Sequence, residues 1–95
     1  MTAREVVIGH RLGLHARASA QLVQLSGKFR SDIRIARSDR GADQAADARS
    51  ILAILLLAAG YGTRVEVRAD GEDEQEAVRA ICDYLEGSVG TVGNG

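Results

Sequence analysis

The residues best suited to chemistry lie in one short segment, LGLHAR, at residues 12–17. His15 stands where a glycine-containing loop meets a run with helical spacing. The first amides of a helix lack intrahelical partners and carry a positive potential, which attracts anions and favours an uncharged imidazole. A neutral imidazole nitrogen is a nucleophile at physiological pH, and the guanidinium of Arg17 can pair with an anion held on that ring. The segment therefore has the parts of a phosphoryl acceptor.

The spacing alone leaves a second interpretation open, because a histidine near a helix start can also be a cap or a surface residue. Other chemistries find less support. No glycine-rich phosphate loop with a following Lys-Ser/Thr is present. Cys82 lies far in sequence from His10 and His15, and the acidic run at 70–74 lacks the ligand spacing of a calcium loop. We expect no metal and no cofactor.

The elements that must position His15 follow from changes in hydrophobic period. Alternating residues indicate half-buried strands, and apolar residues three or four apart indicate helices. Gly27 marks the end of the first helix, Ser50 is placed to cap the second, and the acidic run suits the start of the third. In chain order the pattern predicts a strand over 5–8, a helix over 16–28, strands over 32–37 and, weakly, 42–48, a short buried helix over 50–59, a strand over 64–69 and a helix after 70–74.

This order, β-α-β-β-α-β-α, predicts an α+β fold in one domain over residues 1–89, with a flexible tail at 90–95. Sequential hairpin pairs would make a four-stranded antiparallel sheet, and three amphipathic helices would cover one face of it. The opposite face would expose the polar side chains of the strands, namely Arg34, Arg64, Glu66 and Arg68.

Composition limits the partners. The 95 residues are 45% hydrophobic and 26% charged, with a net charge of −1 and 3% aromatic residues. We therefore expect a globular domain that binds no nucleic acid, since such binders show a basic excess and stacking aromatics. The longest apolar run, residues 51–59, is about half of a membrane span, so no membrane insertion is expected. The lone Cys82 and the lack of a leader pattern predict a cytoplasmic protein, which we expect to be monomeric.

At these residues the chain resembles the histidine-containing phosphocarrier (HPr) family of the bacterial phosphotransferase system. The family motif Gly-Leu-His-x-Arg-Pro-Ala appears as GLHARAS at residues 13–19. The segments ARSIL at 48–52, GYGT at 60–63 and DGEDE at 70–74 match the family layout in the same order. The resemblance covers residues 4–88, implies the HPr open-faced sandwich, and extends to carriers of the nitrogen-related branch.

The resemblance implies a phosphoryl carrier rather than an enzyme. His15 would accept a phosphoryl group on Nδ1 from phospho-enzyme I and pass it to a IIA-type protein. The backbone amides of Ala16 and Arg17 would receive phosphate oxygens, and the Arg17 side chain would neutralise their charge. No metal or cofactor is implied.

The resemblance also implies a docking surface and a regulatory site. The surface comprises residues of the first two helices: Ala16, Arg17, Ala20, Gln24, Ile51 and Leu52. Core packing is the alternative for Ile51. Ser50 matches the serine that HPr kinase/phosphorylase modifies in some bacteria, and an ordinary N-cap is its alternative.

Two departures from the family pattern carry expectations of their own. Ala18 replaces the motif proline, which should loosen the helix start by about 0.5–1 kcal/mol. The segment from Ala36 to Arg49 is a few residues longer than usual, which lengthens the hairpin. Two rival functions remain at this point: a ferredoxin-like small-molecule-binding regulatory domain, and a degenerate relative that binds partners without being phosphorylated.

Overall fold

The computed structural model describes residues 1–87. The elements, in chain order, are β1 (Thr2–Val7), α1 (Ala16–Ser26), β2 (Asp32–Arg37), a 3₁₀ turn (Ala42–Gln44), β3 (Ala46–Asp47), α2 (Ile51–Leu56), β4 (Arg64–Asp70) and α3 (Glu74–Glu86). The predicted order of strands and helices is confirmed. The predicted domain boundary at residue 89 and the predicted tail at 90–95 lie outside the described residues.

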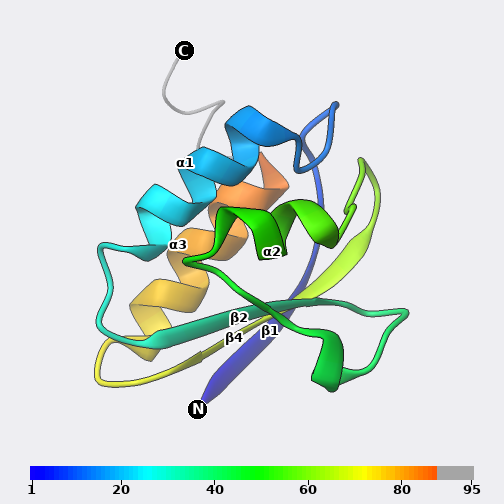
Figure 1. The fold of residues 1–95 in the computed structure, drawn as a ribbon. Coiled ribbons are helices and arrows are strands. Elements are labelled where there is room, and N and C mark those ends of the chain that lie inside the picture. The colour runs from blue at the N-terminus through cyan, green and yellow to red at the C-terminus, as the bar shows by residue number, and fades with distance from the viewer. Residues whose placement is uncertain (88–95) are drawn as a thin grey trace.

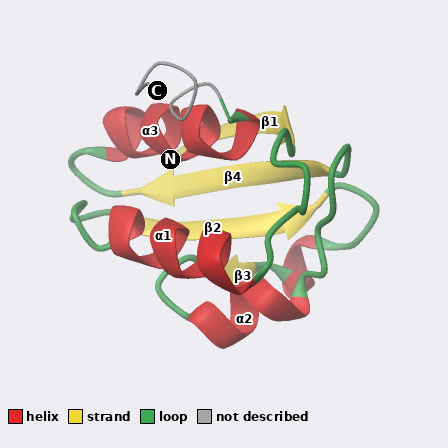
Figure 2. Cartoon of the chain, turned by 90° about the horizontal axis from the view of Figure 1, so that it is seen from above, coloured by secondary structure: helices red, strands yellow, loops and turns green. Residues whose placement is uncertain are grey.

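The four strands form one antiparallel sheet in the order β1-β4-β2-β3. The expectation of sequential hairpin pairs is wrong, because β4 lies between β1 and β2 and only β2 and β3 are consecutive in the chain (Figure 2). Helix α1 carries the chain from β1 across to β2 and leaves the width of one strand between them. Strand β4 fills that gap and has partners on both edges, with Val65 opposite Val6 and Val67 opposite Ile35.

All three helices lie on one side of the sheet, as expected (Figure 1). Ile33 and Ile35 from β2 and Val65 and Val67 from β4 are buried under them. The other side of the sheet carries the expected charged side chains, which pair with one another or with neighbours on the same face: Arg34 with Asp32, Arg64 with Glu5, and Arg68 with Glu66.

Helix α2 departs most from the sequence expectation of a buried helix over 50–59. It ends at Leu56, because Ala58 adopts a left-handed conformation (φ 51°) that a continuing helix excludes. Within the helix only Ile54 is buried. The other large apolar side chains of the helix are exposed, namely Ile51, Leu52, Leu55 and Leu56.

The remaining boundary errors are small and have local causes. The weak strand expected over 42–48 is a 3₁₀ turn followed by only two strand residues, consistent with the poor strand propensity of Asp, Gln and Ala. Strand β1 begins at Thr2 rather than at residue 5, and Ile8 bonds instead to the loop before β4 through its N–H to the Thr63 carbonyl (2.9 Å). Helix α1 ends at Ser26 with Gly27 as its cap, two residues before the predicted end.

The acidic residues before α3 connect this helix to the sheet. Asp73 is the N-cap residue, but its carboxylate accepts hydrogen bonds from Ser31 Oγ (2.6 Å) and from the Arg30 N–H (2.9 Å) instead of capping the helix. Glu74 accepts from Thr2 Oγ1 (2.6 Å) at the start of β1. This hydrogen bond is the largest of the contacts that lower the pKa of Glu74 to about 2.

The depressed pKa of Glu74 predicts an acid-sensitive contribution to stability. The unfolded chain protonates this carboxyl near pH 4.5 and the folded protein only near pH 2, so the stabilisation is complete above pH 4.5 and disappears as the pH falls towards 2. Glu74→Gln should therefore lower the free energy of unfolding at pH 6, and the gap to the unmodified protein should close between pH 5 and pH 2. Urea unfolding at several pH values measures this gap, with exposed Glu76→Gln as the control. A gap that stays constant with pH would contradict the prediction.

Candidate functional site

The loop that leads to His15 lies against the chain that leaves α2. The N–H of Leu14 donates to the carbonyl of Ala59 (2.9 Å), and the N–H of Gly13 donates to the carbonyl of His10 (2.9 Å). Gly13 has a φ of 68°, and a Cβ there would lie 2.6 Å from Gly60 Cα. Only glycine fits both the backbone conformation and the close approach. Residues 59–60 thus form the surface on which the loop rests.

His15 is the N-cap residue of α1. Its backbone is extended (φ −72°, ψ −177°), and its side chain turns back so that Nδ1 accepts a hydrogen bond from the N–H of Arg17 (3.2 Å). A nitrogen that accepts a hydrogen bond carries no proton, so the ring proton of the neutral imidazole is on Nε2. The ring is half-buried. The geometry therefore presents an unprotonated Nδ1 at the opening of the helix.

The surroundings of this nitrogen favour negative charge. The first intrahelical bond runs from the N–H of Ser19 to the carbonyl of His15 (2.8 Å), so the earlier amides have no intrahelical acceptor. Among residues 1–87, the N–H groups of Ala16 and Ala18 donate to no acceptor, and the first turn contains no acidic side chain. The side chain of Arg17 is exposed and pairs with no group in that range. An anion attached to Nδ1 would meet free N–H groups and a free guanidinium.

The other residues singled out from the sequence lie on α1 and α2, which pack against each other. On α1, Ala16 and Gln24 are exposed and Ala20 is half-buried. On α2, Ile51 is 43% exposed and Leu52 is 64% exposed, which excludes core packing for Ile51.

Ser50 caps α2. Its Oγ accepts a hydrogen bond from the N–H of Ala53 (3.2 Å), and the side chain is half-buried. The capping role inferred from the sequence is therefore present in the unmodified protein.

Several exposed apolar side chains near the site were not identified from the sequence. Leu12 on the His15 loop is 78% exposed, and Tyr61 beyond α2 is 69% exposed, in addition to Leu55 and Leu56 on α2. A signal for α2 was present: its sequence, ILAILL, is apolar on every face. A helix that lies on one side of a sheet can bury only one face.

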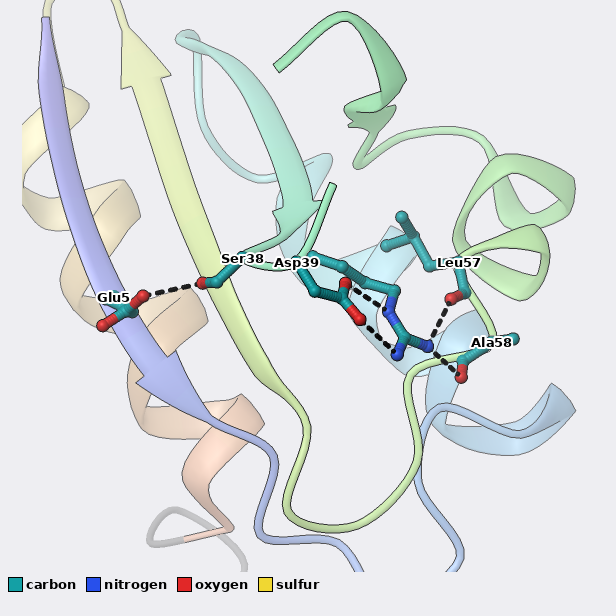
Figure 3. A network of polar contacts seen from close by, with 6 residues as sticks. Glu5, Ser38, Asp39, Leu57 and Ala58 are labelled. Atoms are coloured by element: carbon teal, nitrogen blue, oxygen red, sulfur yellow. Dashed lines mark hydrogen bonds and ion pairs between the residues drawn. The ribbon is translucent and has the colours of Figure 1, made fainter. Parts of the chain in front are cut away.

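Arg37, on β2, holds the end of α2 in place. Its Nη1 donates to the carbonyls of Leu57 (3.3 Å) and Ala58 (3.0 Å), while Nε and Nη2 donate to the two carboxylate oxygens of Asp39 (3.0 and 3.1 Å; Figure 3). The hydrogen bonds from Arg37 lower the pKa of Asp39 below its ordinary value. These contacts fix the residues just before the 59–60 segment under the His15 loop. The scattered arginines of the sequence contained no signal for this contact.

The described part of the chain shows no metal site and no membrane segment. Residues 1–87 contain no cluster of three or more His, Cys, Asp or Glu side chains that could hold a metal ion. No helix within that range is both long enough and apolar enough to cross a bilayer. Cys82 is buried, and burial raises the pKa of its thiol.

Comparisons with known proteins agree with this geometry. Residues 2–87 match the family model described as "PTS HPr component phosphorylation site". The phosphocarrier protein HPr of Cupriavidus necator is 47% identical over 81 residues, which cover 85% of this chain and 86% of that protein. The phosphocarrier protein NPr of Proteus mirabilis is 37% identical over 83 residues, with coverages of 87% and 89%.

A solved structure shows the same fold. The crystal structure of HPr from Thermoanaerobacter tengcongensis superposes with a TM-score of 0.81 at 34% identity and covers 92% of this chain and 93% of its own. The match in sequence and fold leaves no support for a ferredoxin-like regulatory domain. The family is a non-catalytic phosphoryl carrier of the phosphotransferase system, and this chain belongs to the HPr family of phosphocarrier proteins.

Proposed function

We propose that His15 is the residue that carries the phosphoryl group, on Nδ1. The hydrogen bond from the Arg17 N–H to this nitrogen supports the assignment, because it keeps Nδ1 free of a proton and directs its lone pair to the helix opening. The group comes from phospho-enzyme I and passes to a IIA-type protein, the partners that HPr family membership implies.

The transfer requires little covalent chemistry from the carrier. The lone pair of Nδ1 attacks phosphorus while the bond between phosphorus and its donor atom on enzyme I breaks, and the electron pair of that bond returns to the donor atom. Nε2 keeps its proton. As the new P–N bond forms, the Arg17 N–H loses its acceptor on the ring, and a phosphate oxygen takes that place beside the free N–H of Ala16. Positioning and charge stabilisation are what the protein supplies.

Arg17 neutralises part of the phosphoryl charge. Its side chain is exposed and pairs with no carboxylate among residues 1–87, so it is available to an anion on the nearby His15 ring. Solvent exposure also limits the strength of this pairing. A weak pairing suits a carrier, because the phosphoryl group must leave again.

Replacement of the acceptor should abolish function. His15→Ala removes the nucleophile, so incubation with enzyme I and radiolabelled phosphoenolpyruvate should leave the variant unlabelled. The chain contains only one other histidine, His10, so peptide mapping under alkaline conditions can assign the label in the unmodified protein. Circular dichroism checks that the variant is folded. Label on His10, or normal labelling of His15→Ala, would overturn the assignment.

The docking face for both partners comprises the exposed parts of α1 and α2 beside His15. It includes the residues expected from the sequence, namely Ala16, Arg17, Ala20, Gln24, Ile51 and Leu52. We add Leu55 and Leu56, which are exposed on α2 next to them. An apolar patch with a charged rim is the composition of a transient protein interface. Its position next to Nδ1 supports a role in docking.

Leu52 is the best single test of this face, because it is 64% exposed and its loss leaves no cavity in the core. Leu52→Ser should raise the KM for enzyme I about tenfold, the scale of one interface anchor, with kcat nearly unchanged. Val7→Ser is the matched control, since Val7 is an exposed apolar side chain on the opposite face of the sheet. Equal effects of the two substitutions would argue against this docking face.

Ser50 is the proposed regulatory site for HPr kinase/phosphorylase. Its hydroxyl lies at the edge of the docking face, next to Ile51 in sequence. A phosphate there would add negative charge within the surface that binds enzyme I, which would weaken docking by repulsion or desolvation. The cap to Ala53 accounts for this serine without any kinase, so the modification needs a direct test.

Incubation with an HPr kinase and ATP should incorporate one phosphate at Ser50 and slow later labelling of His15. Ser50→Ala should block incorporation while costing about 1 kcal/mol of stability through loss of the cap. The variant should still accept label on His15 from enzyme I. Mass spectrometry locates the phosphate, and absence of incorporation in the unmodified protein would leave Ser50 as a cap only.

A single copy in the cytoplasm is the proposed working form. The acceptor nitrogen, the helix amides and the apolar docking face all belong to one chain. One similar structure, from Thermoanaerobacter tengcongensis, is an HPr dimer, so self-association is within the range of the family.

A further inference from the structure

Tyr84, on α3, contacts the chain on both sides of His15. Its phenol oxygen lies 2.7 Å from Gln21 Oε1 and 3.2 Å from the carbonyl oxygen of Ala18, both on α1. Its backbone carbonyl accepts a hydrogen bond from Nε2 of His10 (2.6 Å), in the loop before the site. The rings of His10 and Tyr84 also pack together, with centroids 4.8 Å apart. Tyr84 thus contacts both the loop before His15 and the helix α1 after it.

Helix α3 is a firm support for these contacts. Helix α3 packs beside α1 and against the sheet. Five of its side chains are buried: Ala77, Val78, Ile81, Cys82 and Leu85. The chain entering the loop is also bonded to its last turn, because the N–H of Gly9 donates to the Leu85 carbonyl (2.8 Å). A Cβ at Gly9 would lie 2.0 Å from the carbonyl oxygen of Glu86, so the backbones are in direct contact there.

The contact at Ala18 falls within the first turn of α1. Alanine leaves φ free at this position, where the family motif has a proline that fixes it. The Ala18 N–H has no acceptor among residues 1–87, so the helix itself holds this residue only through its carbonyl. The Tyr84 hydroxyl has one proton, which it shares between the Ala18 carbonyl (3.2 Å) and Gln21 Oε1 (2.7 Å), so it bonds to α1 at two neighbouring positions. Burial raises the pKa of Tyr84 above its ordinary value of 10, so the hydroxyl keeps its proton at neutral pH.

We propose that Tyr84 and His10 are positioning residues for the phosphoryl acceptor, and that their contacts replace the restraint that proline would supply at position 18. Tyr84 holds the first turn of α1, and His10 holds the loop before it, so Nδ1 of His15 stays directed at the helix amides. This inference rests on the proposed role of His15. It adds two residues that never touch the phosphoryl group.

Tyr84→Phe is the sharpest test, because it removes only the hydroxyl and keeps the ring against His10. Loss of the hydroxyl and of its contacts with Ala18 and Gln21 should slow labelling by phospho-enzyme I about fivefold in kcat, with KM unchanged because the docking face is intact. Hydrogen exchange at the Ser19 amide, which makes the first bond of α1, should accelerate by a similar factor. His10→Ala should accelerate exchange at the Gly13 amide instead, because that amide bonds to the His10 carbonyl. Arg79 is an exposed residue of α3, so Arg79→Ala is the control. It should change neither the labelling kcat nor the exchange of the Ser19 and Gly13 amides.

The rescue decides between positioning and a general loss of stability. Ala18→Pro should restore kcat and Ser19 protection in the Tyr84→Phe background, because proline fixes φ and sacrifices no hydrogen bond at an N–H that has none. In the protein with Tyr84 intact, Ala18→Pro should change neither kcat nor Ser19 exchange by much. A folded Tyr84→Phe protein with normal kcat and normal exchange would overturn the proposal, as would a folded double variant that stays slow. The exchange experiments use unphosphorylated protein, so they test these contacts even if His15 proves not to be the acceptor.

Discussion

The hydrogen bond from the Arg17 N–H to Nδ1 of His15 is the constraint on which the site depends. A serine or aspartate cap would satisfy the same amide with an oxygen, but it would offer no nitrogen nucleophile at that place. Because the capping atom is also the proposed reactive atom, the helix start must be ordered enough to orient the ring and open enough to admit a phosphoryl group. The first turn meets both needs: within the described residues 1–87 the N–H groups of Ala16 and Ala18 have no acceptor, and the turn carries no acidic side chain.

Three sets of contacts hold the start of α1 in place. The chain after α2 supports the loop through the Leu14 N–H and the close contact of Gly13 with Gly60. The buried hydroxyl of Ser19 donates to the carbonyl of Leu14 (2.9 Å), which ties the loop to the helix. On the third side Tyr84 contacts α1 and the preceding loop. The proposed acceptor is therefore held by its neighbours, while the N–H groups expected to meet the phosphoryl group have no acceptor among residues 1–87.

Helix α2 shows how the fold keeps an apolar surface exposed beside the acceptor. All six residues of this helix are apolar, and a helix on one side of a sheet can bury only one of its faces. Contacts at its two ends select that face: Ser50 caps the first turn, and Arg37 binds the carbonyls of Leu57 and Ala58 after the last turn. With Ile54 in the core, the helix is fixed in one rotation that leaves Leu52 in solvent. The contacts of Arg37 therefore help to hold both the proposed docking face and the 59–60 segment under the His15 loop.

Local sequence was sufficient for the element types, their order and the place of His15 at a helix start, because hydrophobic period, glycines and caps act over a few residues. It was sufficient for the α+β class and, through the GLHAR motif, for the family. It was insufficient for strand order, since the insertion of β4 between β1 and β2 depends on pairs far apart in the chain. Local pattern also misjudged α2, because the face that this helix buries depends partly on contacts from another strand, such as those of Arg37 with the carbonyls of Leu57 and Ala58. The contacts of Tyr84 with residues on both sides of His15 join positions more than sixty residues apart, a distance over which no local rule operates.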